Sequence, residues 1–140
     1  MTSRTTQHPP IEPPPSRYRM PDPRHSPPEG LVAAGGDLEP GTVLTAYRAG
    51  IFPWPDREGR VLWWSPDPRA ILPLDGFHES QSLRRRRRSG RFQVTVDRAF
   101  AAVLAGCADR PEGTWITAGI THAYRRLHRL GWAHSIEVWN

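Results

Sequence analysis

Nine of the sixteen prolines lie between residues 9 and 28, and this uneven distribution limits how much of the chain can form a core. The segment has few large apolar side chains, so burial cannot offset the entropy lost when it becomes ordered. Residues 1–28 are therefore predicted to be a disordered Pro-rich tail with polyproline II character. A passive extension is the simpler interpretation, and Pro10 to Pro15 also fit an SH3-type ligand. Roughly 110 residues remain, which supports a modest core.

Charge is the second constraint. All nineteen cationic side chains are arginine, and the net charge of +5 favours a polyanionic partner. Five arginines are consecutive and a sixth follows closely: Arg84, Arg85, Arg86, Arg87, Arg88 and Arg91. Guanidinium groups this close together cannot all be buried, so they face solvent or a polyanion. The run is either a solvated basic segment or a phosphate-binding surface, since guanidinium binds phosphate bidentately.

Tryptophans are concentrated in the middle of the chain. Trp54, Trp63 and Trp64 lie within eleven residues, among prolines and charges rather than in a periodic apolar run. A short domain needs large side chains to bury enough area, which favours an aromatic core. Indole faces also stack on nucleic-acid bases and on other rings, which favours a binding surface. Both interpretations stay open for each single tryptophan.

Turn residues and apolar spacing predict a small α+β unit over residues 29–69. Its expected elements are a helix over 38–49 capped by Asp37 and ended by Gly50, an extended segment over 51–54, and a returning strand over 61–64. Asp67 and Arg69 flank Pro68 and are expected to form an ion pair at a structural corner.

A second pattern occupies residues 70–140. Its expected elements are a short strand over 70–74, a helix over 80–88, a strand over 92–96, a helix from an Asp97 cap to Cys107, a helix over 116–130 ended by Gly131, and a strand over 134–139. The final strand leaves a ladder edge and one apolar face uncovered, so the chain is expected to be incomplete at its C-terminus.

Several chemistries have no signature in the sequence. Cys107 is the single cysteine, which excludes an intramolecular disulfide, and its apolar neighbours predict a buried, inert thiol. The six histidines form no HExxH motif and no Cys/His pairing, so no metal site is expected. GxSxG and P-loop motifs are also missing. No run of about 18 apolar residues occurs, so no membrane association is expected and the cytoplasm is the expected location.

Six uncommon strings, in order, resemble the leucyl/phenylalanyl-tRNA–protein transferases. They are GGDL at 35–38, YRAGIFPW at 47–54, WWSPDPR at 63–69, EGTWIT at 112–117, AYRRLH at 123–128 and AHSIEVW at 133–139. The resemblance covers roughly residues 30 to 140. It implies an α+β fold with a small N-terminal domain at 29–69. Residues 70–140 would then be the opening β-α-α-β of a GNAT-like acyltransferase domain, truncated at Asn140.

The same resemblance implies a reaction and its partners. Leucine or phenylalanine passes from Leu-tRNA or Phe-tRNA to acceptor proteins with N-terminal Arg or Lys, as part of N-end rule protein degradation. The acceptor amine attacks the aminoacyl ester, so proximity and a polarising carboxylate carry much of the catalysis. The family's polar catalytic groups are expected beyond Asn140. No cofactor is implied, and the protein is expected to be a monomer.

Site residues also follow from the resemblance. Tryptophans at the positions of Trp54 and Trp115 line the family's pocket for the 3′-terminal aminoacyl-adenosine. A basic cluster at the position of Arg84 to Arg88 and Arg91 contacts tRNA, although Gln81 stands where relatives often carry a cation. Trp63, Trp64 and Trp139 are assigned to packing, and Trp132 remains ambiguous.

Two alternatives remain from the residues alone. A non-catalytic, arginine-rich RNA-binding module shares the basic run and needs no further domain. A degenerate fragment that does not fold is the other alternative.

Overall fold

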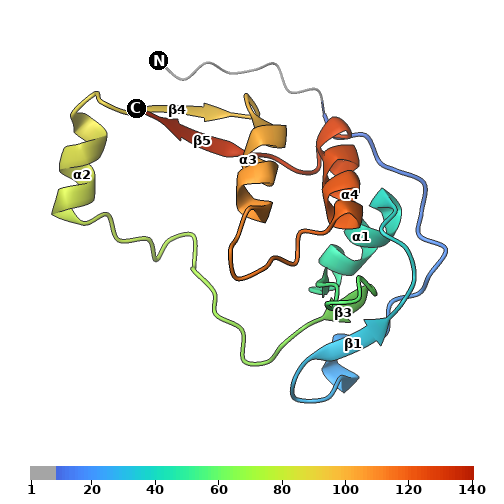
Figure 1. Cartoon of the computed structure of the whole chain (residues 1–140). Coiled ribbons are helices and arrows are strands. Elements are labelled where there is room, and N and C mark those ends of the chain that lie inside the picture. The colour runs from blue at the N-terminus through green and yellow to red at the C-terminus, as the bar shows by residue number, and fades with distance from the viewer. Residues whose placement is uncertain (1–8) are drawn as a thin grey trace.

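The computed structural model describes residues 9–140, which form a mixed α+β structure with two small antiparallel sheets and four α-helices (Figure 1). The expected α+β class is therefore confirmed. The elements are a 3-10 turn at Pro23–His25, β1 (Leu31–Ala34), α1 (Pro40–Arg48), β2 (Phe52–Pro53), β3 (Leu62–Trp64), α2 (Gln81–Arg88), β4 (Gln93–Val96), α3 (Phe100–Ala108), α4 (Ala118–Arg129) and β5 (Ile136–Trp139).

The core lies where α1 and α4 cover the first sheet, whose strand order is β1-β3-β2. Trp63 of β3 is 2% exposed at its centre, and its indole N–H donates to the Gly35 carbonyl at 2.9 Å. The buried residues packed together are Val43, Leu44, Ala46, Ile51, Trp63 and Leu127. Because Leu127 comes from α4, this core already joins the two halves of the chain.

The first helix begins later than predicted. Pro40 stands in the first turn, where a missing N–H costs nothing. Asp37 does not cap this helix; its Oδ1 accepts the Glu39 N–H at 3.1 Å in a turn just before it. The preceding strand β1, paired with β3, was not predicted, because a run of only four apolar residues gives too weak a pattern.

Residues 9–17, here called the N-terminal strap, contradict the predicted disorder. The Ile11 N–H donates to the Leu130 carbonyl at 2.9 Å, and the Ile11 carbonyl accepts from the Trp132 indole N–H at 2.8 Å. A Cβ added at Gly41 of α1 would lie 2.0 Å from the Pro14 carbonyl oxygen. Composition failed here because the strap is ordered by distant partners, not by its own apolar content. Residues 1–8 of the predicted tail lie outside the described residues.

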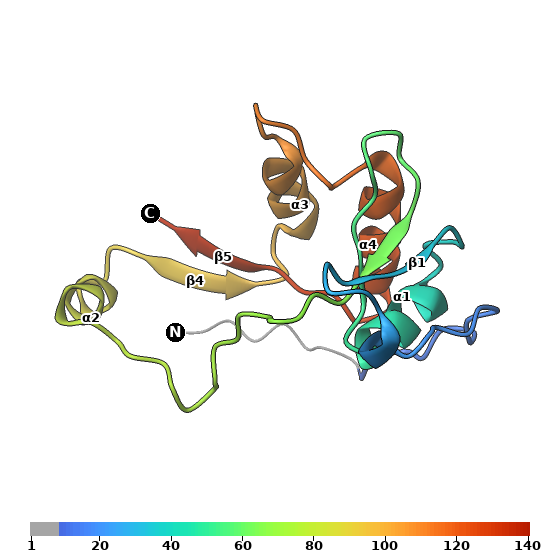
Figure 2. The same ribbon diagram turned by 90° about the horizontal axis from the view of Figure 1, so that it is seen from below.

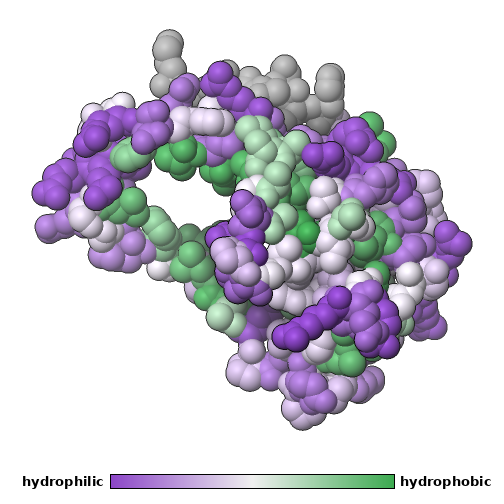
Figure 3. Space-filling view, in the orientation of Figure 1, coloured by the Kyte–Doolittle hydropathy of each residue, from purple (hydrophilic) through white to green (hydrophobic). Residues whose placement is uncertain are grey.

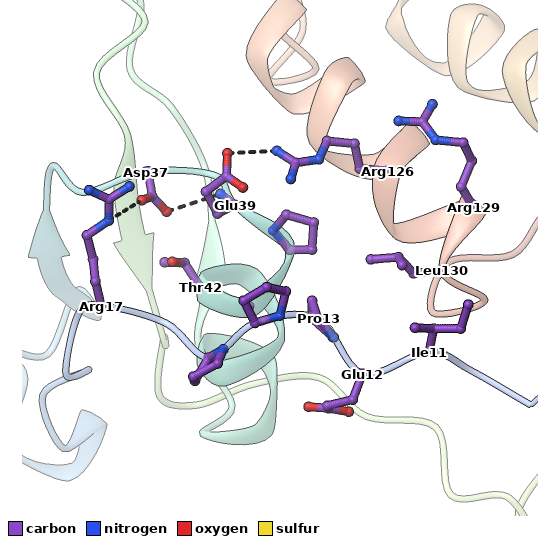
Figure 4. Close-up of a pocket in the computed structure, with 14 residues that line it drawn as sticks. Ile11, Glu12, Pro13, Arg17, Asp37, Glu39, Thr42, Arg126, Arg129 and Leu130 are labelled. Atoms are coloured by element: carbon purple, nitrogen blue, oxygen red, sulfur yellow. Dashed lines mark hydrogen bonds and ion pairs between the residues drawn. The ribbon is translucent and has the colours of Figure 1, made fainter.

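A hollow of about 480 Å³ lies between the strap, α1 and α4 (Figure 4). Ion pairs cross it from all three sides. Arg17 Nε lies 3.3 Å from an oxygen of Asp37, and Arg126 of α4 lies 2.7 Å from Glu39. Because these charges are matched internally, we interpret the hollow as a structural seam.

Residues 70–92 form an arm that carries α2 away from α3 and α4 (Figure 1, Figure 2). The predicted strand over 70–74 is wrong, because no strand partner lies beside this segment among the described residues. The large apolar side chains between residues 70 and 80 are exposed instead: Ile71, Leu72, Leu74 and Phe77. Figure 3 shows hydrophobic residues along this segment, beside an opening between the arm and the rest of the molecule.

The second sheet pairs β4 with β5 and separates its two faces by polarity. Thr95 and Glu137 lie opposite each other and are buried on one face. The other face is apolar and exposed, carrying Val94, Val96, Ile136 and Val138. A half-buried antiparallel sheet normally shows the reverse arrangement.

Three smaller predictions, two of them near the second sheet, are also wrong. Asp97 does not cap α3: it has a φ of +59°, and its Oδ1 accepts the Ser135 N–H at 2.9 Å. Cys107 is exposed, because α3 packs against α4 on only one side. Arg69 forms no pair with Asp67; it donates to the Gly50 carbonyl at 3.0 Å and lies over the Phe52 ring.

Candidate functional site

Trp54 is held at the end of β2 with its ring outside the core. Its N–H donates to the Leu62 carbonyl at 2.8 Å, and its carbonyl accepts the Trp64 indole N–H at 3.2 Å. Prolines on both sides restrict the backbone further. The side chain is nevertheless 48% exposed. A large flat ring on a fixed backbone is thereby presented at the surface.

Trp115 lies in the loop that leads into α4. Gly113 has a φ of +94°, and its N–H donates to the Arg110 carbonyl at 3.0 Å, which closes a tight turn. The Thr117 side chain then caps α4 by accepting the Ile120 N–H at 3.3 Å. The loop ends are thus fixed, and the half-buried Trp115 stands between them.

The structure brings these two tryptophans together. Their ring centroids lie 5.2 Å apart with an interplanar angle of 18°, which is a stacked pair. The two residues are far apart in sequence and come from separate elements. Direct ring contact leaves no room for a base between the two rings, so the ring face available for stacking is the exposed face of Trp54.

Two tyrosines extend this aromatic cluster: Tyr124 contacts Trp115, and Tyr47 contacts Tyr124. Neither was predicted as a site residue from the sequence. Tyr124 of α4 meets Trp115 edge-on, with centroids 6.1 Å apart at 77°. Its hydroxyl is hydrogen-bonded to that of Tyr47 from α1. Burial, then the bond to Tyr47, raises the pKa of Tyr124, so the hydroxyl stays protonated. Tyr47 lies in the string YRAGIFPW and Tyr124 in AYRRLH, and membership of these strings is the sequence signal that could have identified them.

A hollow of about 830 Å³ opens beside the tryptophan pair. Its lining combines aromatic, charged and small residues: Trp54, Pro55, Asp56, Arg57, Cys107, Arg110, Glu112, Gly113, Thr114, Trp115 and Ile116. Arg60 lies 2.6 Å from Asp56 and neutralises it. The site therefore offers ring faces for stacking and charges of both signs at its rim.

The arginine run is not part of this hollow. Arg84 to Arg88 lie on α2 and Arg91 follows it, all of them exposed. In both views α2 is at the end of the arm (Figure 1, Figure 2). The site residues expected from sequence thus form two separate surfaces, one aromatic and one basic.

A buried carboxylate links the second sheet to the start of α3. Glu137 accepts hydrogen bonds from the Ser135 and Thr95 hydroxyls, both at 2.5 Å, and from the Ala99 N–H at 3.1 Å. These bonds, that from Ser135 first, lower the pKa of Glu137 to about 2. An ionised group satisfied in this way favours the folded state, because the unfolded carboxyl has the ordinary, higher pKa.

Glu137→Gln is expected to lower the melting temperature near neutral pH, since an amide cannot accept all three bonds. Ionised Glu137 stabilises the fold above pH 4.5 and loses this effect as pH falls towards 2. The difference in melting temperature between wild type and variant should therefore be largest above about pH 5 and shrink on acidification. Thermal melts from about pH 7 down to about pH 2.5 measure it. A difference that does not change with pH would show that the charge is unimportant.

Two features are absent from residues 9–140. Within that range no group of three His, Cys, Asp or Glu side chains lies close enough to hold a metal ion. In the same range no helix has the length and apolar character needed to cross a membrane.

Two family models match the chain. One, described as leucyl/phenylalanyl-tRNA protein transferase, matches residues 71–140, and a second, described as the N-terminal domain of that protein, matches residues 36–67. The chain belongs to this family. Trp54 lies in the matched N-terminal segment of the transferase family and Trp115 in the other, so the stacked pair joins the two matched regions.

Curated members of the transferase family are similar in sequence. The leucyl/phenylalanyl-tRNA–protein transferase of Anaeromyxobacter dehalogenans (strain 2CP-C) is 53% identical over 130 residues, which is 90% of this chain and 56% of the relative. Those of Shigella sonnei (strain Ss046) and Enterobacter sp. (strain 638) are 54% and 56% identical over 114 residues, covering 81% of this chain and 49% of each relative. The chain spans about half the length of the curated relatives it matches.

Proposed function

We propose that this chain supplies the tRNA-binding and aminoacyl-adenosine-binding part of a transferase that moves leucine or phenylalanine from charged tRNA to proteins with N-terminal Arg or Lys. The observation that supports this most is the stack of Trp54 on Trp115 beside an 830 Å³ hollow. An unpaired terminal base exposes a π-face, and such stacking contributes about 1–3 kcal/mol per base.

The proposed roles follow from the two surfaces. The adenine of the tRNA end stacks on the exposed face of Trp54, and Trp115, braced by Tyr124, keeps that ring in place. The apolar walls of the hollow suit a leucine or phenylalanine side chain. Arginines of α2 hold phosphates further along the tRNA. Binding both ends of the substrate in one orientation lowers the entropic cost of the later attack by the acceptor amine.

The fold is proposed to be the opening of a GNAT-like acyltransferase domain, which the order β4, α3, α4, β5 supports. The protein is proposed to act as a monomer in the cytoplasm, where charged tRNA is found. A second function, that of a non-catalytic RNA-binding module, is favoured by one observation: the arginine run is exposed on an arm separate from the tryptophan pair.

Replacing all five arginines from Arg84 to Arg88 with glutamine should weaken tRNA binding irrespective of tRNA sequence. For each phosphate that the variant no longer binds, the plot of log affinity against log salt should become shallower by roughly 0.7–0.9. Fluorescence anisotropy with labelled tRNA at several salt concentrations measures this slope. Because none of the five side chains is buried, the variant should still fold, and circular dichroism checks this. An unchanged slope would mean that the run is only a solvated helix.

A further inference from the structure

The five arginines of α2 are not equivalent. Glu79, just before the helix, accepts a hydrogen bond from Arg87 Nε at 2.7 Å and one from Arg84 Nε at 3.2 Å. These bonds, that from Arg87 first, lower the pKa of the Glu79 carboxyl, which keeps it ionised. Residues three apart lie on the same face of a helix, so one carboxylate reaches both guanidiniums. Arg84 and Arg87 are thereby partly neutralised.

The opposite face of the helix is left open. Arg85 and Arg86 follow Arg84 by one and two residues, which turns them away from Glu79. Together with Ser89, Arg91 and Phe92 they line a hollow of about 290 Å³. None of these three arginines forms an ion pair with another described residue. Arg88 lies on the Glu79 side by its spacing but is also unpaired within residues 9–140.

The chemistry of this hollow fits one nucleotide of an RNA chain. Three arginines line a space with room for a phosphate group, and the guanidinium group is the one that binds phosphate bidentately. Phe92 is 39% exposed at its edge and offers a ring face to a neighbouring unpaired base. The partial negative charge at the C-terminus of α2 opposes an anion, but three full positive charges outweigh it.

We propose that Arg85, Arg86 and Arg91 hold one phosphate of bound RNA, that Phe92 stacks on the adjoining base, and that Glu79 withholds Arg84 and Arg87 from the RNA. The inference rests on the proposed function, in which the α2 surface binds tRNA, and it assigns that binding to specific residues. Glu79 then acts as an internal competitor that limits non-specific affinity for polyanions.

Two double variants of the full chain with equal loss of charge test this assignment. R85Q/R86Q and R84Q/R87Q each remove two positive charges from the same exposed helix. Binding of unfractionated bacterial tRNA is measured by anisotropy across a range of salt concentrations. R85Q/R86Q should lower the affinity at least about 10-fold and make the salt slope shallower by roughly 0.7–0.9, the value for one bound phosphate. R84Q/R87Q should change both much less.

Two further variants sharpen the test. Glu79→Gln releases two guanidiniums and should tighten tRNA binding and steepen its salt dependence. Phe92→Leu keeps an apolar side chain but removes the ring face, and should weaken tRNA binding about 5-fold or more, as for one stacked base.

The outcomes separate this inference from the proposed function. Equal decreases in affinity in the two double variants, or an unchanged affinity in Glu79→Gln, would overturn the division of the run while leaving tRNA binding by α2 in place. If neither double variant binds less tightly, and replacement of all five arginines also leaves the slope unchanged, then α2 does not contact RNA and both are overturned.

Discussion

Trp63→Ala is expected to destabilise the fold by about 3–5 kcal/mol, the usual cost of removing a fully buried large aromatic side chain. Trp63 is 2% exposed at the centre of the core, and its indole N–H is the hydrogen-bond partner of the Gly35 carbonyl. The substitution removes the central side chain of the core cluster, to which α1 contributes three residues and α4 contributes Leu127. Urea unfolding followed by circular dichroism measures the change in free energy.

Trp64→Ala provides the matched control for that measurement. Trp64 is the next residue in β3, so its side chain points to the other face of the sheet and is only half-buried. The control should cost clearly less than Trp63→Ala. Equal costs at the two positions would show that the first sheet does not separate a buried from an open face, contrary to the structure.

Trp115→Ala should leave the protein folded while the affinity for an aminoacyl-adenosine analogue falls by about 1–3 kcal/mol, or about 5- to 150-fold. The ring is half-buried and packs chiefly on Trp54 and Tyr124, outside the main core. A thermal melt beside a binding titration with the analogue separates the two effects. Removing Trp115 also frees Trp54 to adopt other orientations, which weakens stacking further.

Trp139→Ala is a suitable control, because Trp139 is an exposed tryptophan of β5 whose indole donates to Thr95, apart from the tryptophan pair. It should leave the analogue affinity unchanged. If Trp115→Ala instead lowers the melting temperature strongly and leaves the analogue affinity as it was, Trp115 belongs to the core and not to a pocket.

Local signals predict the elements whose ends are set within the chain itself. The helix predicted over 80–88 is observed at 81–88 with Ser80 as its cap, and the long helix ends at Arg129, two residues before Gly131, which has a φ of +79°. Elements ordered by distant partners escape prediction. The strap is ordered by α1 and α4, and β1 by its pairing with β3, and neither interaction leaves a periodic trace in the sequence.

The candidate site also has residues that the sequence indicates and contacts that it does not. The family resemblance points to Trp54 and Trp115, but their contact is a tertiary fact that no spacing rule reveals. The Tyr47–Tyr124 bond escapes prediction because its two hydroxyls come from α1 and α4. The pairing of Glu79 with Arg84 and Arg87 also escapes prediction, because Glu79 precedes the helix and lies five and eight residues before its partners, outside the i, i+3 and i, i+4 spacings.

The most direct test of the proposed function compares the affinity of this chain for leucyl-tRNA with that for the same tRNA without leucine. Both tRNAs present identical phosphates to α2, so any difference arises at the aminoacyl end. Anisotropy or filter binding at one salt concentration measures the two dissociation constants. We expect tighter binding of leucyl-tRNA, with a smaller preference in Trp115→Ala, because Trp115 lines the hollow proposed to take the leucine side chain. Equal affinity for the two tRNAs would contradict the proposal and identify the chain as a basic RNA-binding module.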